Sequence, residues 1–180
     1  MNNICRRLLP ILLLIWPYLC LIPFWAGSQN ENLYEPLLSV YMMLTVAVYL
    51  LNIISACTDK REDAYRRLAF WDMMMKVAHV PFYLMMFVLG VLLLFTIVVP
   101  AMIVVTPLMV GILVVIDLLL MITTSLYGIS ALFRAWRRGL LSKTYIVVHI
   151  LMHCFFVTDV ISAVMICFKL RKTEKGNKFE

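Results

Sequence analysis

The feature that most constrains the fold is a long uncharged run in the middle of the chain. No Asp, Glu, Lys or Arg lies between Lys76 and Asp117. Water-soluble domains keep roughly a quarter of their residues charged, so an apolar run long enough for two helices belongs in hydrocarbon. Over the whole chain 64% of the residues are hydrophobic and only 14% are charged. The sequence therefore predicts one integral membrane domain, all-α, over residues 1–180.

Five apolar segments each come close to the roughly 20 residues that a helix needs to cross a bilayer. The central run is divided at Pro100 and Pro107, because prolines on both sides of AMIVVT suit a tight turn between antiparallel helices. The first segment carries three prolines and lacks an Ala-x-Ala cleavage site, so we interpret it as a retained, proline-kinked helix. The predicted bundle has five transmembrane helices, at 8–26, 36–57, 77–99, 107–133 and 144–168.

The distribution of Arg and Lys predicts how the helices are oriented. Short cytoplasmic loops collect basic residues. Such residues precede the first segment and follow the second and fourth, whereas the connections 27–35 and 100–106 contain none. This pattern predicts a cytoplasmic N-terminus.

The C-terminal tail breaks this pattern, because Lys169, Arg171 and Lys172 follow the fifth segment. Either the tail lies outside after a full crossing, or segment 144–168 enters the membrane and leaves on the cytoplasmic side. A lipid-exposed re-entrant loop would leave backbone groups unpaired. We therefore expect five crossings with the C-terminus outside.

The net charge of +6 is explained by basic clusters beside the membrane, without a domain that could organise them on nucleic acid. We expect anionic lipid headgroups as their partners and no nucleic acid. A membrane protein partner or a homo-oligomer is also possible for a chain of this class. The residues expected at the headgroups are Arg66, Arg67, Arg134, Arg137 and Arg138.

Charged and titratable residues within the apolar segments need an explanation, because each costs a few kcal/mol unless it is paired or hydrated. Counted along the predicted helices, Asp117 and His153 lie near the midplane. His149 precedes His153 by four residues and shares its helix face. The predicted intramembrane polar layer consists of Lys76, His79, Asp117, His149, His153 and Asp159.

Two interpretations of this layer stay open. Asp117 could pair with His153 or His149, as an ion pair or as a neutral pair sharing a proton, and so support an ion pathway. Alternatively, the same residues hold helices together through hydrogen bonds, while Lys76 extends to the headgroups and pairs with Asp72 at the interface.

A metal site is the sharper alternative. Two histidines at i and i+4 can reach one ion, and Asp117 would supply a third ligand to His149 and His153. A zinc protease would also need the glutamate of HExxH, whereas only apolar residues lie between these histidines. The sequence also has no CxxC pair, no phosphate-binding loop and no GxSxG motif. We predict no catalytic residue and no cofactor.

Three segments resemble a group of small multi-pass membrane proteins of unknown function from Firmicutes-type bacteria. They are KVAHVPFY (76–83), FRAWRRGLLSK (133–143) and FVTDVISAV (156–164), and the resemblance covers about residues 65–170. It implies a bacterial plasma membrane location but no activity, and His153 departs from the pattern. The shared polar positions would be Lys76, His79, Pro81, Tyr83, Asp117 and Asp159.

Together these features favour a non-enzymatic membrane component that binds a partner or supports an ion or small-solute pathway. The rival hypothesis is an intramembrane metal-binding protein or metal-dependent enzyme that uses His149, His153 and Asp117. A third hypothesis, an immunity protein against an exported peptide toxin, rests only on the size and class of the chain.

Overall fold

The computed structural model describes residues 5–59, 64–153 and 156–177, and these residues contain helices and no strand. The elements are α1 (Cys5–Ile15), η1 (Trp16–Cys20), α2 (Leu21–Gln29), α3 (Glu31–Thr58), α4 (Ala64–Phe95), η2 (Thr96–Val98), η3 (Pro100–Met102), α5 (Val105–Arg137), α6 (Lys143–Met152) and α7 (Phe156–Asn177). The all-α prediction is confirmed for this part of the chain.

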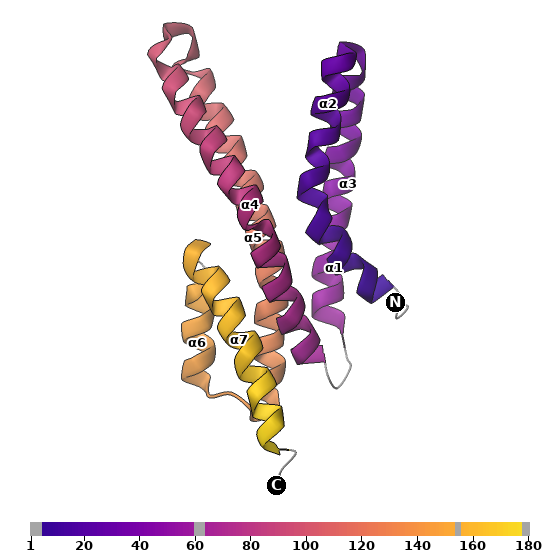
Figure 1. Ribbon diagram of the computed structural model, residues 1–180, viewed down its shortest axis with the longest axis vertical. Coiled ribbons are helices and arrows are strands. Elements are labelled where there is room, and N and C mark those ends of the chain that lie inside the picture. The colour runs from indigo at the N-terminus through magenta and orange to yellow at the C-terminus, as the bar shows by residue number, and fades with distance from the viewer. Residues whose placement is uncertain (1–4, 60–63, 154–155, 178–180) are drawn as a thin grey trace.

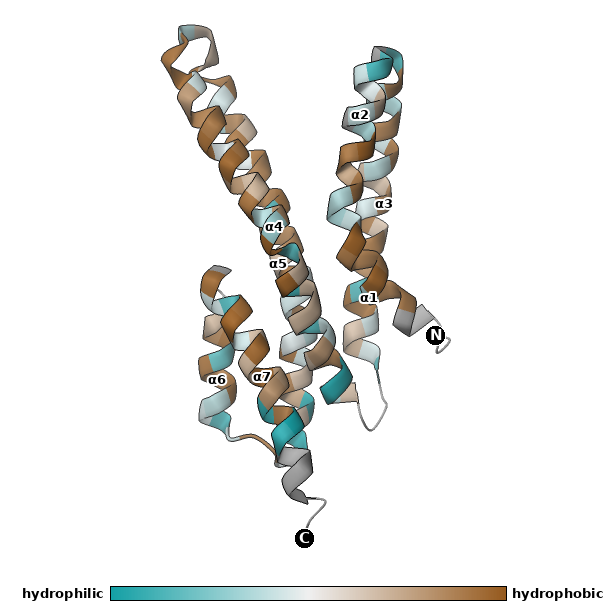
Figure 2. Cartoon of the chain, viewed as in Figure 1, coloured by the Kyte–Doolittle hydropathy of each residue, from teal (hydrophilic) through white to brown (hydrophobic). Residues whose placement is uncertain are grey.

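The helices form two arms that diverge toward one end of the molecule (Figure 1). The first arm contains α1, η1, α2 and α3, and the second contains α4 and α5. Helices α6 and α7 lie beside the half of the second arm from which α4 starts. Apolar residues cover most of both arms, and hydrophilic residues gather at the tip of the first arm and at the opposite end of the molecule (Figure 2).

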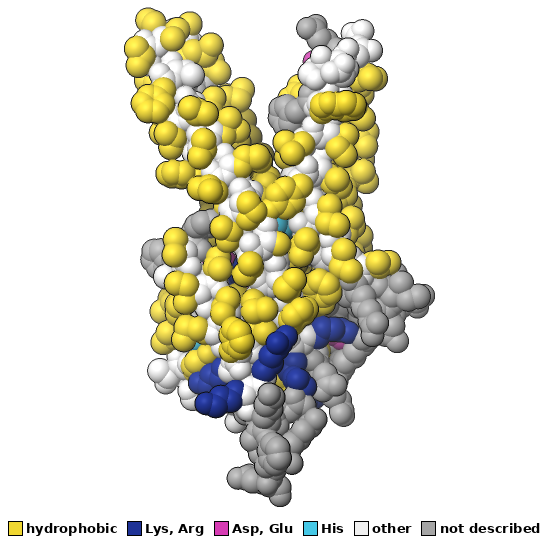
Figure 3. Space-filling model, in the orientation of Figure 1, with side chains coloured by type: hydrophobic (Ala, Val, Ile, Leu, Met, Phe, Trp, Pro, Cys, Tyr) yellow, Lys and Arg dark blue, Asp and Glu magenta, His cyan; other side chains and the backbone are white. Residues whose placement is uncertain are grey.

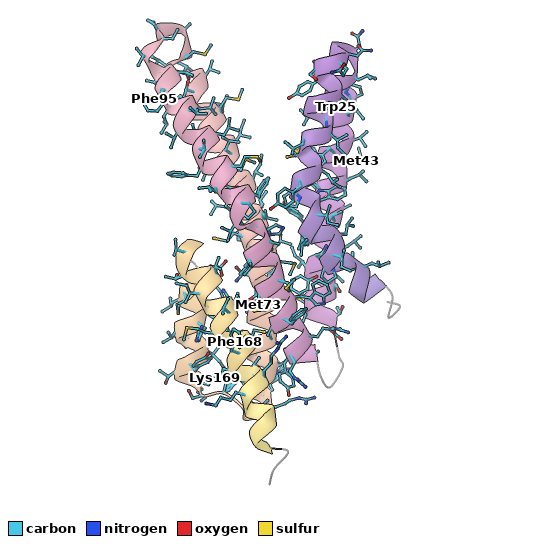
Figure 4. All side chains as sticks on the ribbon, viewed as in Figure 1. Trp25, Met43, Met73, Phe95, Phe168 and Lys169 are labelled. Carbon is cyan, nitrogen blue, oxygen red and sulfur yellow. The ribbon has the colours of Figure 1, made fainter. Side chains whose placement is uncertain are left out.

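Four segments are long and apolar enough to cross a membrane, namely Leu8–Gln29, Asn32–Thr58, Ala64–Val98 and Val105–Arg137. Large apolar side chains project from them, as Trp25, Met43 and Phe95 do in Figure 4. Trp25 is 70% exposed and Phe95 is 71% exposed. Side chains of this kind are suited to contact with lipid, so the composition and the fold both indicate a membrane protein.

The first segment is bent, as its prolines predict. Pro17 lies within the short 3-10 helix η1, which separates α1 from α2. Trp16 stacks on Tyr41 of α3 with ring centroids 5.6 Å apart, and its indole N–H donates to Thr45 Oγ1 at 2.8 Å. These contacts hold the bend against the neighbouring helix.

Prolines also mark the connection between α4 and α5, as predicted. Pro100 starts η3, and Pro107 lies in the first turn of α5. The hydroxyl groups of Thr96 and Thr106 are 2.7 Å apart and link the two sides of the turn. Helix α4 begins at Ala64, well before the predicted start at residue 77, because its first turns continue as helix past Asp72 and Lys76.

The fifth predicted crossing, 144–168, is not one helix, so this prediction is wrong. It is divided between α6 and α7, which run in opposite directions (Figure 1). Three contacts follow the antiparallel register: Tyr145 with Lys169, His149 with Ser162, and His153 with Asp159. We call α6 and α7 together the C-terminal hairpin.

Two described residues that flank the tip of the hairpin, His153 and Thr158, make hydrogen bonds to backbone carbonyls of α6. The hydroxyl of Thr158 donates to the carbonyl of Met152 at 2.8 Å. The amide of His153 donates to the carbonyls of His149 and Ile150. A full crossing was expected because a re-entrant loop exposed to lipid would leave backbone groups unpaired. Irregular backbone is tolerated at membrane depth where protein buries it.

Because α7 returns antiparallel to α6, its C-terminal turns lie at the same end of the molecule as the basic residues of α4 and α5 (Figures 1 and 3). Lys and Arg side chains gather there, and the face shown in Figure 3 is otherwise mainly apolar. We use the name basic end for this end of the molecule, where the start of α4, the end of α5 and the C-terminal turns of α7 meet. The predicted placement of the C-terminus on the opposite side is therefore not confirmed, and in this arrangement the tail lies with the other basic segments.

The hairpin predicts which sites are accessible from one side of a membrane. In a cysteine-free background, Lys143→Cys and Lys172→Cys should react with an impermeant maleimide from the same side of oriented vesicles. Ser28→Cys, in the exposed last turn of α2, should react from the other side. Labelling of Lys143→Cys and Lys172→Cys from opposite sides would restore the five-crossing topology.

Candidate functional site

Four charged or titratable residues meet where the C-terminal hairpin contacts α4. Asp72 and Lys76 come from α4, His153 follows α6, and Asp159 lies in the first turn of α7. Their exposed fractions are 0%, 2%, 4% and 4%, respectively. We call these residues the charged cluster. A buried charge persists only where other groups compensate it, so the internal geometry of the cluster determines what it can do.

Lys76 is the central residue of the charged cluster. Its Nζ lies 3.0 Å from Asp72 Oδ1 and 2.7 Å from His153 Nδ1, and it donates to Asp159 Oδ1. Asp72 and Lys76 are four residues apart on α4, which places both on one helix face. A single ammonium group therefore joins α4 to both helices of the hairpin.

His153 Nδ1 also contacts Asp159 Oδ1, so Nζ, Nδ1 and Oδ1 form a triangle of mutual contacts. When His153 carries a proton on Nδ1, it can donate to Asp159 but cannot accept from Lys76. When Nδ1 is unprotonated, its single lone pair accepts either from Lys76 or from a protonated carboxyl group of Asp159. The triangle therefore has more than one favourable arrangement of protons.

Helix α5 forms a wall of the charged cluster through two small residues. Ser125 Oγ lies 3.3 Å from Asp159 Oδ1 and donates to it. A Cβ atom on Gly128 would lie 2.5 Å from Asp72 Oδ2 and 2.8 Å from His153 Nε2. Both distances are too short for real contacts, so only glycine at this position lets the two side chains approach α5.

A second polar layer lies about one helical turn nearer the basic end. His149 Nδ1 is 2.7 Å from Ser162 Oγ, and both side chains are buried. The ring of His149 packs on Tyr145, with centroids 4.1 Å apart. Lys169 Nζ lies 3.6 Å from the centroid of Tyr145, which is a cation–π contact. The interior of the hairpin is thus polar from the charged cluster to the basic end.

His79 shares α4 with the charged cluster but points to the first arm. Its Nε2 lies 3.2 Å from the carbonyl oxygen of Leu14, close to the bend at Pro17. Proline lacks the N–H that a helix would offer to the carbonyl four residues earlier, so the bend leaves acceptors that a nearby donor can satisfy. This contact gives His79 a role in holding α1 against α4.

Asp117 does not join the histidines. It lies about two turns, or roughly 12 Å, from Ser125 along α5. Its side chain is half-buried in a groove between α4 and α5. The expected pairing of Asp117 with His153 or His149 is therefore not seen, because the depth estimate placed His153 on a helix that crosses the whole membrane.

The proposed metal ligands are not brought together either. Among the described residues, no group of three or more His, Cys, Asp or Glu side chains could hold a metal ion. His153 and Asp159 do converge, but Lys76 Nζ occupies the position between them. An ammonium group thus supplies the positive charge that a metal would bring.

Sequence reasoning missed part of this site. Asp72 was expected in an interfacial salt bridge, whereas it is fully buried with Lys76. Ser125, Gly128 and Ser162 were not among the residues predicted for the polar layer. The spacing of Asp72 and Lys76 could be read from the sequence, but the partners on α5 and α7 depend on the hairpin.

Comparison with protein families gives a match to the family model described as "Family of unknown function (DUF6652)", over residues 7–172. The chain belongs to this family. The match includes both arms and most of the hairpin, so all four residues of the charged cluster lie within it. No curated protein and no solved structure matches the chain. Membership therefore assigns no activity to the charged cluster.

The contact at Gly128 predicts a strong effect of one added methyl group. Gly128→Ala should displace Asp72 or His153 and lower the free energy of unfolding by about 1–3 kcal/mol, as overpacking does. Gly111→Ala on the same helix is the matched control, because a Cβ there meets nothing within 4 Å. The measurement is chemical unfolding in detergent. Equal stability of the two variants would contradict the close packing at Gly128.

Removal of the central ammonium should be costly. Lys76→Met leaves the carboxylates of Asp72 and Asp159 buried without their shared cation, so we expect a loss of about 3–5 kcal/mol in the free energy of unfolding. Lys143→Met, at the exposed start of α6, is the control and should change stability by less than about 1 kcal/mol. Similar unfolding curves for the two variants would show that Lys76 does not hold the cluster together.

Proposed function

We propose that this chain is a non-enzymatic membrane protein whose charged cluster binds and releases a proton and thereby supports a proton pathway. The observation that carries the proposal is the triangle of Lys76 Nζ, His153 Nδ1 and Asp159 Oδ1. Groups that can be satisfied in two protonation states can exchange a proton without separating. Buried Asp, Lys and His groups of this kind are typical of proton relays in membrane proteins.

The charge balance of the cluster supports the same interpretation. With Asp72 and Asp159 ionised, Lys76 charged and His153 neutral, the cluster has a net charge of −1. One additional proton on His153 or on a carboxyl group makes it neutral. An unbalanced charge is costly in an apolar environment, so the buried net charge supports a proton-binding role for the cluster.

The polar layer of the hairpin suggests how protons reach the cluster. His149 lies one turn nearer the basic end than His153, on the same face of α6, and contacts Ser162. Imidazole and hydroxyl groups can both donate and accept protons. We infer that His149 and Ser162 connect the charged cluster to the basic end, and that Asp117 is not part of this connection.

We further propose that the basic end faces the cytoplasm of a bacterial cell. Short cytoplasmic loops collect Arg and Lys, and anionic headgroups attract them. Arg67 is partly occupied by an ion pair with Asp59, and Arg134 donates to the last carbonyls of α3, including Cys57 at 2.9 Å. The headgroup contacts proposed for Arg66, Arg137 and Arg138 would add to these internal contacts.

A direct test is proton flux in proteoliposomes under a potassium diffusion potential, followed with an internal pH-sensitive dye. Wild-type protein should carry protons faster than protein-free liposomes. Asp159→Asn should reduce the flux to the level of protein-free liposomes, because the amide cannot exchange a proton with His153. Glu35→Gln, which removes a carboxylate from the exposed connection 27–35, should leave the flux unchanged.

Folding must be monitored in parallel, by size-exclusion profile and thermal unfolding of each variant. Asp159→Glu is the conservative variant and should retain part of the flux. Wild-type flux equal to that of protein-free liposomes would overturn the proposal. Unchanged flux in a folded Asp159→Asn variant would remove the charged cluster from the pathway.

A further inference from the structure

A groove between α4 and α5 contains a carboxylate that the charged cluster does not use. Its volume is about 620 Å³, which is within the usual range of small-molecule sites. Its lining is apolar apart from the hydroxyl of Tyr83 and the carboxylate of Asp117, and includes Phe87, Val114 and Met121. No Lys or Arg side chain is among the lining residues.

Asp117 is the unusual member of this lining. Its Oδ1 atom is buried and has no hydrogen-bond partner within the part of the chain that the structure describes. A carboxylate among apolar groups costs several kcal/mol unless a cation or a hydrogen-bond donor compensates it. The compensation for Asp117 therefore has to come from a bound proton or from a ligand.

We propose that this groove is a binding site for a lipophilic organic cation, with Asp117 as the counter-charge. The apolar walls would bury the body of the ligand, and the carboxylate would hold its positive centre. A neutral lipid chain would fill the groove but leave Asp117 uncompensated, and an anion would be repelled. The site is about 12 Å along α5 from Ser125, so it does not rest on the proton function of the charged cluster.

The groove depends on the absence of a side chain at Gly90. This residue lines the groove, and a Cβ there would meet nothing within 4 Å. A large side chain in place of Gly90 would therefore not clash with α4. It would instead fill part of the groove that a ligand would occupy. Gly111 on α5 is equally open but does not line the groove, which makes it a matched control.

The test is equilibrium dialysis of tetraphenylphosphonium against the purified protein in lipid nanodiscs, with empty nanodiscs as background. Wild-type protein should bind this probe saturably with one site per chain. Asp117→Asn should weaken binding by about tenfold or more, since each 1.4 kcal/mol is a factor of ten. Gly90→Phe should abolish binding by filling the groove, whereas Gly111→Phe should bind as wild type does.

Tetraphenylborate, an anion of nearly the same shape, separates charge recognition from partition into lipid. It should show no saturable binding above empty nanodiscs. Equal affinity for the two probes, or unchanged phosphonium binding in Asp117→Asn, would overturn the proposal. Absence of saturable phosphonium binding would also overturn the proposal. If, in that case, a second chain co-purifies only when Asp117 is present, the partner of Asp117 is a basic transmembrane helix and not a small cation.

Discussion

The contacts of one ammonium group determine how the C-terminal part of this molecule is arranged. Lys76 binds the carboxylates of Asp72 and Asp159 and lies beside His153, so its position on α4 fixes where α6 ends and where α7 begins. Without these partners a lysine in an apolar helix would extend toward water. The hairpin instead brings a carboxylate and an imidazole to the lysine, which stabilises its buried position.

A second interaction limits how far the two arms separate. Tyr127 of α5 donates to Asn52 Oδ1 of α3 at 2.7 Å, and Asn52 donates to the carbonyl of Val48 at 2.8 Å. Both residues are buried, and Tyr127 directly precedes Gly128 on α5. The arms are therefore held together by polar contacts on the side of the charged cluster and diverge where their facing residues are apolar.

Sequence reasoning predicted the four long apolar segments, the proline bend and the proline turn, because hydrophobic length and proline stereochemistry act locally. It failed at residues 144–168, because hydropathy measures whether a segment tolerates lipid and not whether it turns back. Lys169, Arg171 and Lys172 already indicated a return to the basic end. This error placed His153 at the same depth as Asp117. The predicted pairing of Asp117 with His153 depended on that depth and therefore failed with it.

The charged cluster and Asp117 differ in how their charges are compensated, and this difference separates their roles. Each residue of the cluster lies beside a group of opposite charge or a hydrogen-bonding group, although Asp72 Oδ2 and His153 Nε2 have no hydrogen-bond partner among the described residues. Asp117 has no ion pair with the cluster, and its Oδ1 also has no hydrogen-bond partner in the described part of the chain. Both sites include residues of α4 and are bordered by α5. If occupancy of one alters the packing of these helices, thermodynamic linkage requires that the proton and the cation change each other's affinity by the same factor.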